Sequence, residues 1–222
     1  MLLVLWDVDG TLVHTAGHGR YAFEEAFEVV LGHTPAEAVS YAGRTDQQIA
    51  LSMLGEDHRH LPRVLEELVV ALEGRREQVR AEGRLYPGVA EVLEVLHGRE
   101  DVVQSLLTGN VKANAVLKVS AFGLERWLDL EVGAYGSDPH ERRSDLVAVA
   151  RERNAGRYGE STGVVLVGDT PLDVEAAKEA GARAVAVATG FADLDALRAS
   201  APEALLADLA DTDAAVAAIT GG

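Results

Sequence analysis

The sequence contains no cysteine at any of its 222 positions. Disulfide bonds, thiolate metal sites and thiol nucleophiles are therefore excluded, and a covalent mechanism would need a different nucleophile. Long apolar runs are also missing, since no stretch approaches the roughly 20 apolar residues of a membrane span. The apolar run LLVLW at residues 2–6 is too short for a secretory signal and ends at a pair of charged residues. We therefore expect a cytoplasmic protein that does not insert into a membrane.

Basic residues are scarce in this chain. Lys and Arg number 20 against 36 Asp and Glu, which gives a formal net charge of −16 at pH 7. Such a surface repels the phosphate backbone of nucleic acids and the headgroups of acidic membranes, so we predict neither as a partner. A small anion bound in a local positive pocket is compatible with this charge.

Hydrophobic residues, 48% of the chain, are grouped in short runs. Four of these runs are typical of strands that are buried on both faces of a parallel sheet, namely 2–6, 102–107, 163–167 and 184–188. They alternate with helical patterns at 89–97, 112–122, 145–154 and 171–180. This order predicts an α/β fold with a doubly wound parallel sheet.

One long segment interrupts the alternation. Residues 15–85 contain helical patterns such as RYAFEEAFEVVLG and no convincing strand. About 70 residues are far more than a crossover between parallel strands requires. We therefore predict an α/β core formed by residues 1–14 and 86–222, and an inserted helical cap formed by residues 15–85.

Polar residues follow three of the predicted strands, in the order Asp7 and Asp9, then Thr108, Gly109 and Asn110, then Asp169 and Asp173. Each group has a local alternative, because Asp-Gly and Thr-Gly-Asn also form ordinary turns and Asp-Thr also caps helices. The carboxyl ends of parallel strands, however, lie along one edge of a sheet, where ligands bind. Three such groups together predict a binding crevice at that edge.

The residue types in these groups suit phosphate chemistry. Aspartates supply the hard oxygen ligands that Mg²⁺ prefers, usually together with a substrate phosphate. The hydroxyl of Thr108 and the neighbouring backbone N–H groups can bind phosphate oxygens in a small turn. With cysteine absent and no Ser-His pair suggested, a carboxylate is the candidate nucleophile.

These residues resemble the haloacid dehalogenase-like (HAD) superfamily, in particular its phosphatase branch with a helical cap, of the phosphoglycolate phosphatase type. The sequence DVDGT at 7–11 matches the DxDGT motif, TGN at 108–110 is similar to the second motif, and GDTPLD at 168–173 matches the acidic GDxxxD motif. The resemblance implies that Asp7 is the nucleophile and takes up the phosphoryl group as an aspartyl-phosphate. It implies that Asp9 protonates the leaving alcohol and then activates water.

The resemblance also implies a Mg²⁺ site. Its ligands would be Asp7, the backbone carbonyl of Asp9 and Asp169, with Asp173 supporting the site directly or through water. The residues that bind the transferring phosphoryl group would be Thr108, Gly109 and Asn110.

The third motif departs from the family pattern. The family places a lysine before the helix that precedes the acidic motif, whereas this region reads GSDPHERRSDLVAVA and has none. We predict that Arg143, or else Arg142, replaces it, because arginine is permanently charged and binds phosphate through two donors. The alternative is that both are surface arginines. Lys112 and Lys118 are further candidates for the missing cation.

Within the predicted cap, the sequence GRTD at 43–46 is similar to a loop that closes over the active site in related phosphatases. Arg44 is the candidate substrate contact in this loop, and a solvated arginine is the alternative. Thr45 or Asp46 is expected to cap the following helix.

Taken together, the sequence predicts a Mg²⁺-dependent phosphatase that acts on a small phosphorylated metabolite. A phosphomutase of the same family and a catalytically silent binding or regulatory protein are the alternatives. A haloacid dehalogenase fits less well, because that activity generally lacks the second aspartate. We expect a monomer or a homodimer.

Overall fold

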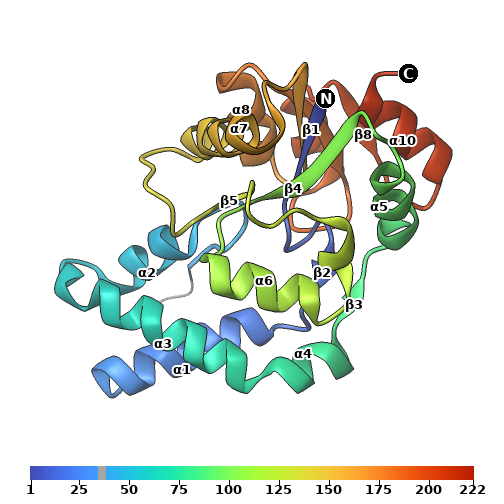
Figure 1. Cartoon of the computed structure of the whole chain (residues 1–222). Coiled ribbons are helices and arrows are strands. Elements are labelled where there is room, and N and C mark those ends of the chain that lie inside the picture. Colours follow the sequence, from blue (N-terminus) through green and yellow to red (C-terminus); the bar gives the residue numbers. More distant parts are fainter. Residues whose placement is uncertain (35–38) are drawn as a thin grey trace.

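The protein is built around a six-stranded parallel sheet (Figure 1). The computed structural model describes residues 1–34 and 39–222, so residues 35–38 of the predicted cap lie outside the described residues. The strands in their spatial order are β5 (Ala134–Tyr135), β4 (Val102–Thr108), β1 (Leu2–Trp6), β6 (Gly163–Gly168), β7 (Arg183–Val187) and β8 (Ala204–Leu206). The first strand of the chain therefore lies inside the sheet, with a neighbour on each side.

Helices cover both faces of this sheet. The helices of the core are α5 (Val89–His97), α6 (Lys112–Ser120), α7 (Arg143–Tyr158), α8 (Pro171–Glu179), α9 (Leu194–Ala199) and α10 (Thr212–Thr220), with the short 3₁₀ helix η2 (Leu124–Trp127). Alternate residues of β1 enter opposite cores: Val4 packs in the cluster that contains Leu93 of α5, and Leu5 in the cluster that contains Val174 of α8. The prediction of a doubly wound α/β sheet is confirmed.

The predicted strands and helices of the core are present, and the predictions missed only short elements. The four predicted strands correspond to β1, β4, β6 and β7, and the four predicted helices to α5, α6, α7 and α8. The edge strands β5 and β8 were not predicted. They contain two and three residues, which is too few for a hydrophobic period to be visible.

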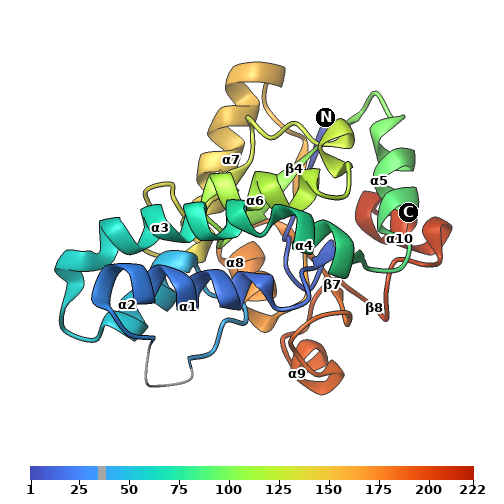
Figure 2. The ribbon, with the colours of Figure 1, turned by 90° about the horizontal axis from the view of Figure 1, so that it is seen from below.

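The segment between β1 and α5 is helical, with one exception. It forms α1 (His18–Leu31), α2 (Asp46–Leu54), the 3₁₀ helix η1 (His58–His60), α3 (Leu61–Gly74) and α4 (Arg76–Glu82). These helices share a core of their own, to which α6 contributes Leu117. Figure 2 shows α1 and α3 side by side, as their many shared contacts require. The domain boundaries themselves stay a prediction.

The exception is a small antiparallel pair, β2 (Val13–His14) with β3 (Arg84–Leu85). The expectation of no strand in residues 15–85 was therefore wrong at its last two positions. Two-residue strands carry no readable alternation, and this pair exists because the chain leaves and re-enters the core at the same place. The pairing joins the two ends of the helical insertion.

Among the described residues, no helix is both long enough and apolar enough to cross a membrane.

Candidate active site

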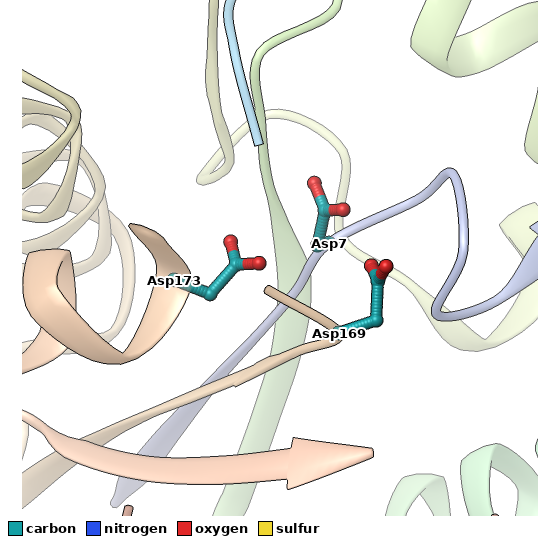
Figure 3. A group of neighbouring side chains, drawn as sticks. All are labelled: Asp7, Asp169 and Asp173. Atoms are coloured by element: carbon teal, nitrogen blue, oxygen red, sulfur yellow. The ribbon is translucent and has the colours of Figure 1, made fainter. Parts of the chain in front are cut away.

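Three aspartates meet at the carboxyl edge of the sheet (Figure 3). Asp7 follows β1, Asp169 follows β6, and Asp173 lies in the first turn of α8. All three are buried, and each offers an oxygen within 4.8 Å of the others. The strand register explains the meeting, because Trp6 pairs with Val167 and so brings the two strand ends level. The structure thus brings together the first and last predicted motifs, which are more than 150 residues apart in the sequence.

The helix cap and the turn that were the local alternatives for these motifs are both present, but residues next to the aspartates form them. Thr170, not Asp169, caps α8, and Asp173 completes the capping box by accepting from the Thr170 backbone N–H at 3.1 Å. Gly10 adopts a left-handed turn with φ 90°, and its N–H donates to Val13 O. The turn does not fold the chain back on β1, since β2 pairs with β3 instead.

Two hydrogen bonds and two closely packed glycines position the Asp169 carboxylate. The Thr11 hydroxyl donates to its Oδ1 at 3.1 Å, and the Phe191 backbone N–H donates to its Oδ2 at 2.9 Å. A Cβ atom on Gly10 or on Gly190 would overlap this carboxylate. Sequence reasoning did not find Gly190 or Phe191, because neither belongs to a motif that it used.

The three aspartates form a buried site in which their ionised forms are unfavourable unless positive charge is nearby. Burial raises the pKa of Asp7 well above its usual value, and Arg143 only partly offsets that effect. Burial and the neighbouring Asp173 charge raise the pKa of Asp169 to about 7. A bound cation would relieve this repulsion, and three carboxylates with hard oxygens are a donor set that suits Mg²⁺. The residues therefore fit the predicted metal.

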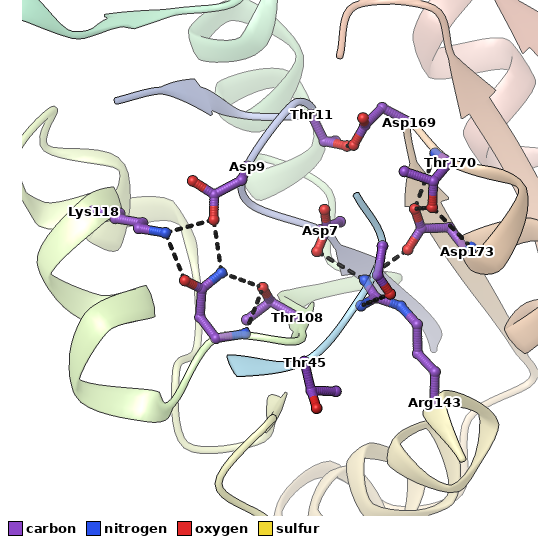
Figure 4. A network of polar contacts seen from close by, with 12 residues as sticks. Asp7, Asp9, Thr11, Thr45, Thr108, Lys118, Arg143, Asp169, Thr170 and Asp173 are labelled. Atoms are coloured by element: carbon purple, nitrogen blue, oxygen red, sulfur yellow. Dashed lines mark hydrogen bonds and ion pairs between the residues drawn. The ribbon is translucent and has the colours of Figure 1, made fainter. Parts of the chain in front are cut away.

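Arg143 is the cation that the structure places inside the cluster (Figure 4). Its Nη2 lies 2.9 Å from Asp7 Oδ1 and 2.6 Å from Asp173 Oδ1. Its side chain is buried, and Nη1 donates to Gly43 O at 3.3 Å. Arg142 lies at the surface, 3.6 Å from a Glu179 oxygen. Of the two arginines considered for the missing lysine, only Arg143 therefore lies at the predicted nucleophile.

The two lysines considered for the same role occupy different places. Lys112 pairs with Glu131 at the surface. Lys118 is buried and pairs with Asp9, with its Nζ 2.5 Å from Asp9 Oδ2. Lys118 was a fallback candidate for the missing cation, with packing along a helix face as the alternative, and its pairing with the second aspartate was not predicted.

The second motif lines the same cavity as Asp7 and Asp9, and it contacts Asp9 directly. Asn110 Nδ2 donates to Asp9 Oδ2 and to Thr108 Oγ1, both at 2.8 Å. Because Thr108 Oγ1 accepts here, its own hydrogen can be donated to a phosphate oxygen. The Gly109 carbonyl accepts from the Asp46 N–H at 2.8 Å, so the opposite side of this turn contacts the helical insertion.

The loop at residues 43–46 closes over the site from the insertion. The Asp46 carboxylate in this loop accepts a hydrogen bond from the Val111 N–H, next to the second motif, at 2.8 Å. Burial raises the pKa of Asp46 to about 6, and Lys118 partly offsets this. A Cβ atom on Gly109 would overlap Arg44 O and lie 2.8 Å from Thr45 Cα, so this close approach requires glycine. Thr45 caps α2 in a capping box with Gln48, as expected.

The Arg44 guanidinium forms its hydrogen bonds with other residues of the helical insertion. It donates to Gln48 O at 2.9 Å and to Ser52 Oγ at 2.5 Å. To contact a phosphate it would have to leave these partners, and its role as a substrate contact stays a prediction.

A cavity of about 430 Å³ lies between the insertion and the sheet edge. Its floor includes Asp7, Asp9, Thr108 and Arg143. Its remaining lining is rich in aromatic side chains, contributed by Tyr21, Phe23, Tyr41, Tyr86 and Phe191. All of the predicted site residues except Asp169 and Asp173 therefore line a space large enough for a small organic substrate.

Comparison with known proteins assigns the chain to a family. Residues 4–178 match the haloacid dehalogenase-like hydrolase family, and residues 145–212 match a related HAD-hydrolase-like family. The chain belongs to the haloacid dehalogenase-like hydrolase family. The resemblance seen in the sequence motifs is thereby confirmed.

The relatives of this HAD-like hydrolase include named phosphatases. It is 31% identical to the probable phosphatase IndB of Dickeya dadantii, over 92% of this chain and 88% of that protein. It is 32% identical to a phosphoglycolate phosphatase of Synechococcus elongatus, over 93% of this chain and 92% of that protein. The crystal structure of a predicted phosphatase from Clostridium acetobutylicum has the same fold, with a TM-score of 0.74 and 16% identity over 94% of both chains. The expectation of a hydrolase of the HAD phosphatase type is confirmed.

Proposed function

We propose that this HAD-like hydrolase is a Mg²⁺-dependent phosphatase that hydrolyses a small phosphorylated metabolite through an aspartyl-phosphate on Asp7. The observation that carries the proposal is the position of Asp7. Its carboxylate lies on the floor of the cavity, 2.9 Å from the Arg143 guanidinium and beside two further buried carboxylates. Without cysteine, it is the nucleophile that these surroundings favour.

The side chains around Asp7 suit phosphoryl transfer, which depends mainly on positioning and on stabilisation of charge. Arg143 orients the Asp7 carboxylate and supplies positive charge for the phosphoryl oxygens. Thr108 supplies a hydroxyl donor from the neighbouring strand end. Asp9 lines the same cavity and is the group that we propose as the proton donor to the leaving oxygen.

The metal would be held by Asp7, Asp169 and the backbone carbonyl of Asp9, with Asp173 in support. Bound Mg²⁺ would neutralise phosphate charge and favour the ionised form of these carboxylates. The raised pKa values of Asp7 and Asp169 support this assignment, because both groups lack sufficient positive charge in the protein alone.

The substrate class is supported by the cavity and by the relatives. A volume of about 430 Å³ accommodates a small phosphate ester. One relative is named for phosphoglycolate, and sugar phosphates are the other class that we propose. That the enzyme works in the cytoplasm, as a monomer or a homodimer, stays a prediction.

The test is phosphate release from p-nitrophenyl phosphate and from a panel of phosphorylated metabolites. We expect turnover with Mg²⁺, its loss with EDTA, loss of most activity toward every substrate in Asp7→Asn, and loss of most activity toward alkyl phosphates in Asp9→Asn. Asp195→Asn, at an exposed position on α9, is the matched control and should retain activity. Acid quenching should trap a phosphoryl group on the peptide that contains Asp7.

Two outcomes would replace the proposal. Conversion of a sugar phosphate to its isomer without phosphate release would indicate the phosphomutase. Absence of turnover across the whole panel, with Mg²⁺ present and the protein folded, would indicate the silent binding protein.

A further inference from the structure

Asp9 receives two hydrogen bonds on the same carboxylate oxygen. Lys118 Nζ lies 2.5 Å from Asp9 Oδ2, and Asn110 Nδ2 lies 2.8 Å from the same atom (Figure 4). The other oxygen, Oδ1, is therefore the one that can exchange a proton with a substrate. Asp9 is partly exposed and lines the cavity. The two donors therefore determine which of its carboxylate oxygens stays available to a substrate in the cavity.

Lys118 also orients the second donor, Asn110. Its Nζ also donates to Asn110 Oδ1 at 2.6 Å. This bond fixes which end of the Asn110 amide faces Asp9, because the amide nitrogen must then point away from the lysine. The same nitrogen donates to Thr108 Oγ1, so one ammonium group orders Asp9, Asn110 and Thr108 together.

Lys118 is buried in largely apolar surroundings. Its side chain is only 6% exposed, on a helix whose adjacent residues Leu117 and Val119 pack in hydrophobic cores. A buried ammonium costs free energy unless it is paired, and removing one partner of such a pair leaves the other charge uncompensated. The carboxylates of Asp9 and Asp46 supply the negative charge around it.

We propose that Lys118 is a positioning residue for Asp9: it holds Oδ2 so that Oδ1 faces the oxygen of the leaving group. The inference rests on the proposed function. In the first step, a bond forms between an Asp7 oxygen and phosphorus, the bond from phosphorus to the leaving oxygen breaks, and the Asp9 proton passes to that oxygen. Lys118 makes this proton transfer possible through geometry and does not touch the phosphoryl group.

The dependence of the rate on the leaving group tests this role. An alkyl phosphate needs the Asp9 proton, whereas p-nitrophenolate departs as a stable anion without it. General acid catalysis contributes about 10²-fold or more. We therefore expect Lys118→Met to lower kcat/KM for an alkyl phosphate about 100-fold and for p-nitrophenyl phosphate less than about 10-fold. Asp9→Asn should show the same contrast between the two substrates.

A matched control and a chemical rescue complete the experiment. Lys178→Met removes a lysine whose Nζ binds Ser200 O at the surface, and it should leave both rates unchanged. Because the chain has no cysteine, Lys118→Cys can be unfolded, alkylated at one position with 2-bromoethylamine and refolded, which restores an ammonium group at nearly the same place. The alkylated protein should regain most of the activity toward the alkyl phosphate.

Several results would overturn the proposal. Equal losses toward both substrates in Lys118→Met would indicate a general structural or electrostatic role, and so would failure of the alkylated Lys118→Cys protein to recover while its melting temperature is restored. If Asp9→Asn shows no contrast between the substrates, Asp9 does not supply the proton and Lys118 cannot position it. If the unaltered protein hydrolyses neither ester, the proposed phosphatase function fails first and the role of Lys118 falls with it.

Discussion

The Arg143 guanidinium lies 2.9 Å from the carboxylate of Asp7, although the two residues are 136 positions apart in the chain. The same Nη2 atom lies 2.6 Å from Asp173, so one cation joins the carboxylates that follow β1 and that begin α8. Asp173 and Asp7 raise the pKa of Arg143, against the opposing effect of burial, and its charge is therefore permanent. A charge of this kind, fixed beside the nucleophile, is suited to a phosphoryl group.

We expect Arg143→Ala to lower kcat for p-nitrophenyl phosphate about 100-fold, because a fixed charge at the reacting group contributes on this scale. Arg142→Ala is the matched control, since Arg142 is exposed and its partners among the described residues are surface carboxylates. Its kcat should stay within about twofold of the unaltered protein. Equal, small losses in both variants would contradict the assignment of Arg143 to the role of the family lysine.

Binding of Mg²⁺ should weaken as the pH falls. The pKa of Asp169 is raised to about 7 by burial and by the Asp173 charge, so protons compete with the cation near neutrality. Between pH 8 and pH 6 the ionised fraction of such a group falls about tenfold, and the Kd for Mg²⁺ should rise by at least about that factor. Titration calorimetry at the two pH values measures this change, and an unchanged Kd would contradict the metal assignment.

The stability of the metal-free protein should change with pH in a direction that follows from the same group. The folded state binds the Asp169 proton more tightly than the unfolded chain, in which the pKa of aspartate is near its usual value of 3.8. The contribution of Asp169 to the free energy of unfolding is therefore greatest below that pH and is lost as the pH rises through about 4 to 7. In EDTA, the melting temperature of Asp169→Asn should depend less on pH over this range than that of the unaltered protein. A parallel dependence in the two proteins would contradict the raised pKa.

Gly109→Ala should impair catalysis more than folding. The added Cβ would overlap Arg44 O, so the loop at 43–46 would have to move away from the second motif. Displacement of catalytic groups by about 1 Å can cost up to about 100-fold in rate. We expect kcat/KM to fall at least about tenfold, with a melting temperature that stays close to that of the unaltered protein. A variant with normal kinetics would show that the loop does not need to approach this closely.

Two glycines near the end of α7 should respond to alanine with opposite signs. Gly156 lies inside the helix, and an added Cβ would meet no heavy atom of the described residues outside its own helical turn within 4 Å, so Gly156→Ala should stabilise the protein by about 0.5–1 kcal/mol. Gly159 has φ 86°, a conformation that alanine adopts at a cost, so Gly159→Ala should destabilise it. Neither should change kcat, because both lie outside the cavity. Urea denaturation measures both, and stability changes of the same sign would contradict this account.

The class of fold and most of the candidate site could be predicted from the sequence alone. Runs of Val and Leu with a strand length, each followed by a helical period, predict a parallel sheet without any knowledge of contacts. Since all strands of such a sheet end at one edge, Asp7, Thr108 and Asp169 could be expected to meet before their distances were known. Local chemistry was readable too, as the capping boxes of α2 and α8 show.

The pairing of individual side chains could not be predicted and is visible only in the folded protein. Arg142 and Arg143 are adjacent in the sequence and chemically identical, yet the first turn of α7 directs one to the surface and the other into the aspartate cluster. Lys118 was one of several cations near the second motif until the packing of α6 placed its ammonium on Asp9, 109 residues away. Periodicity and motifs are local properties, whereas such pairings depend on strand register and helix rotation, and these are settled by packing across the whole core.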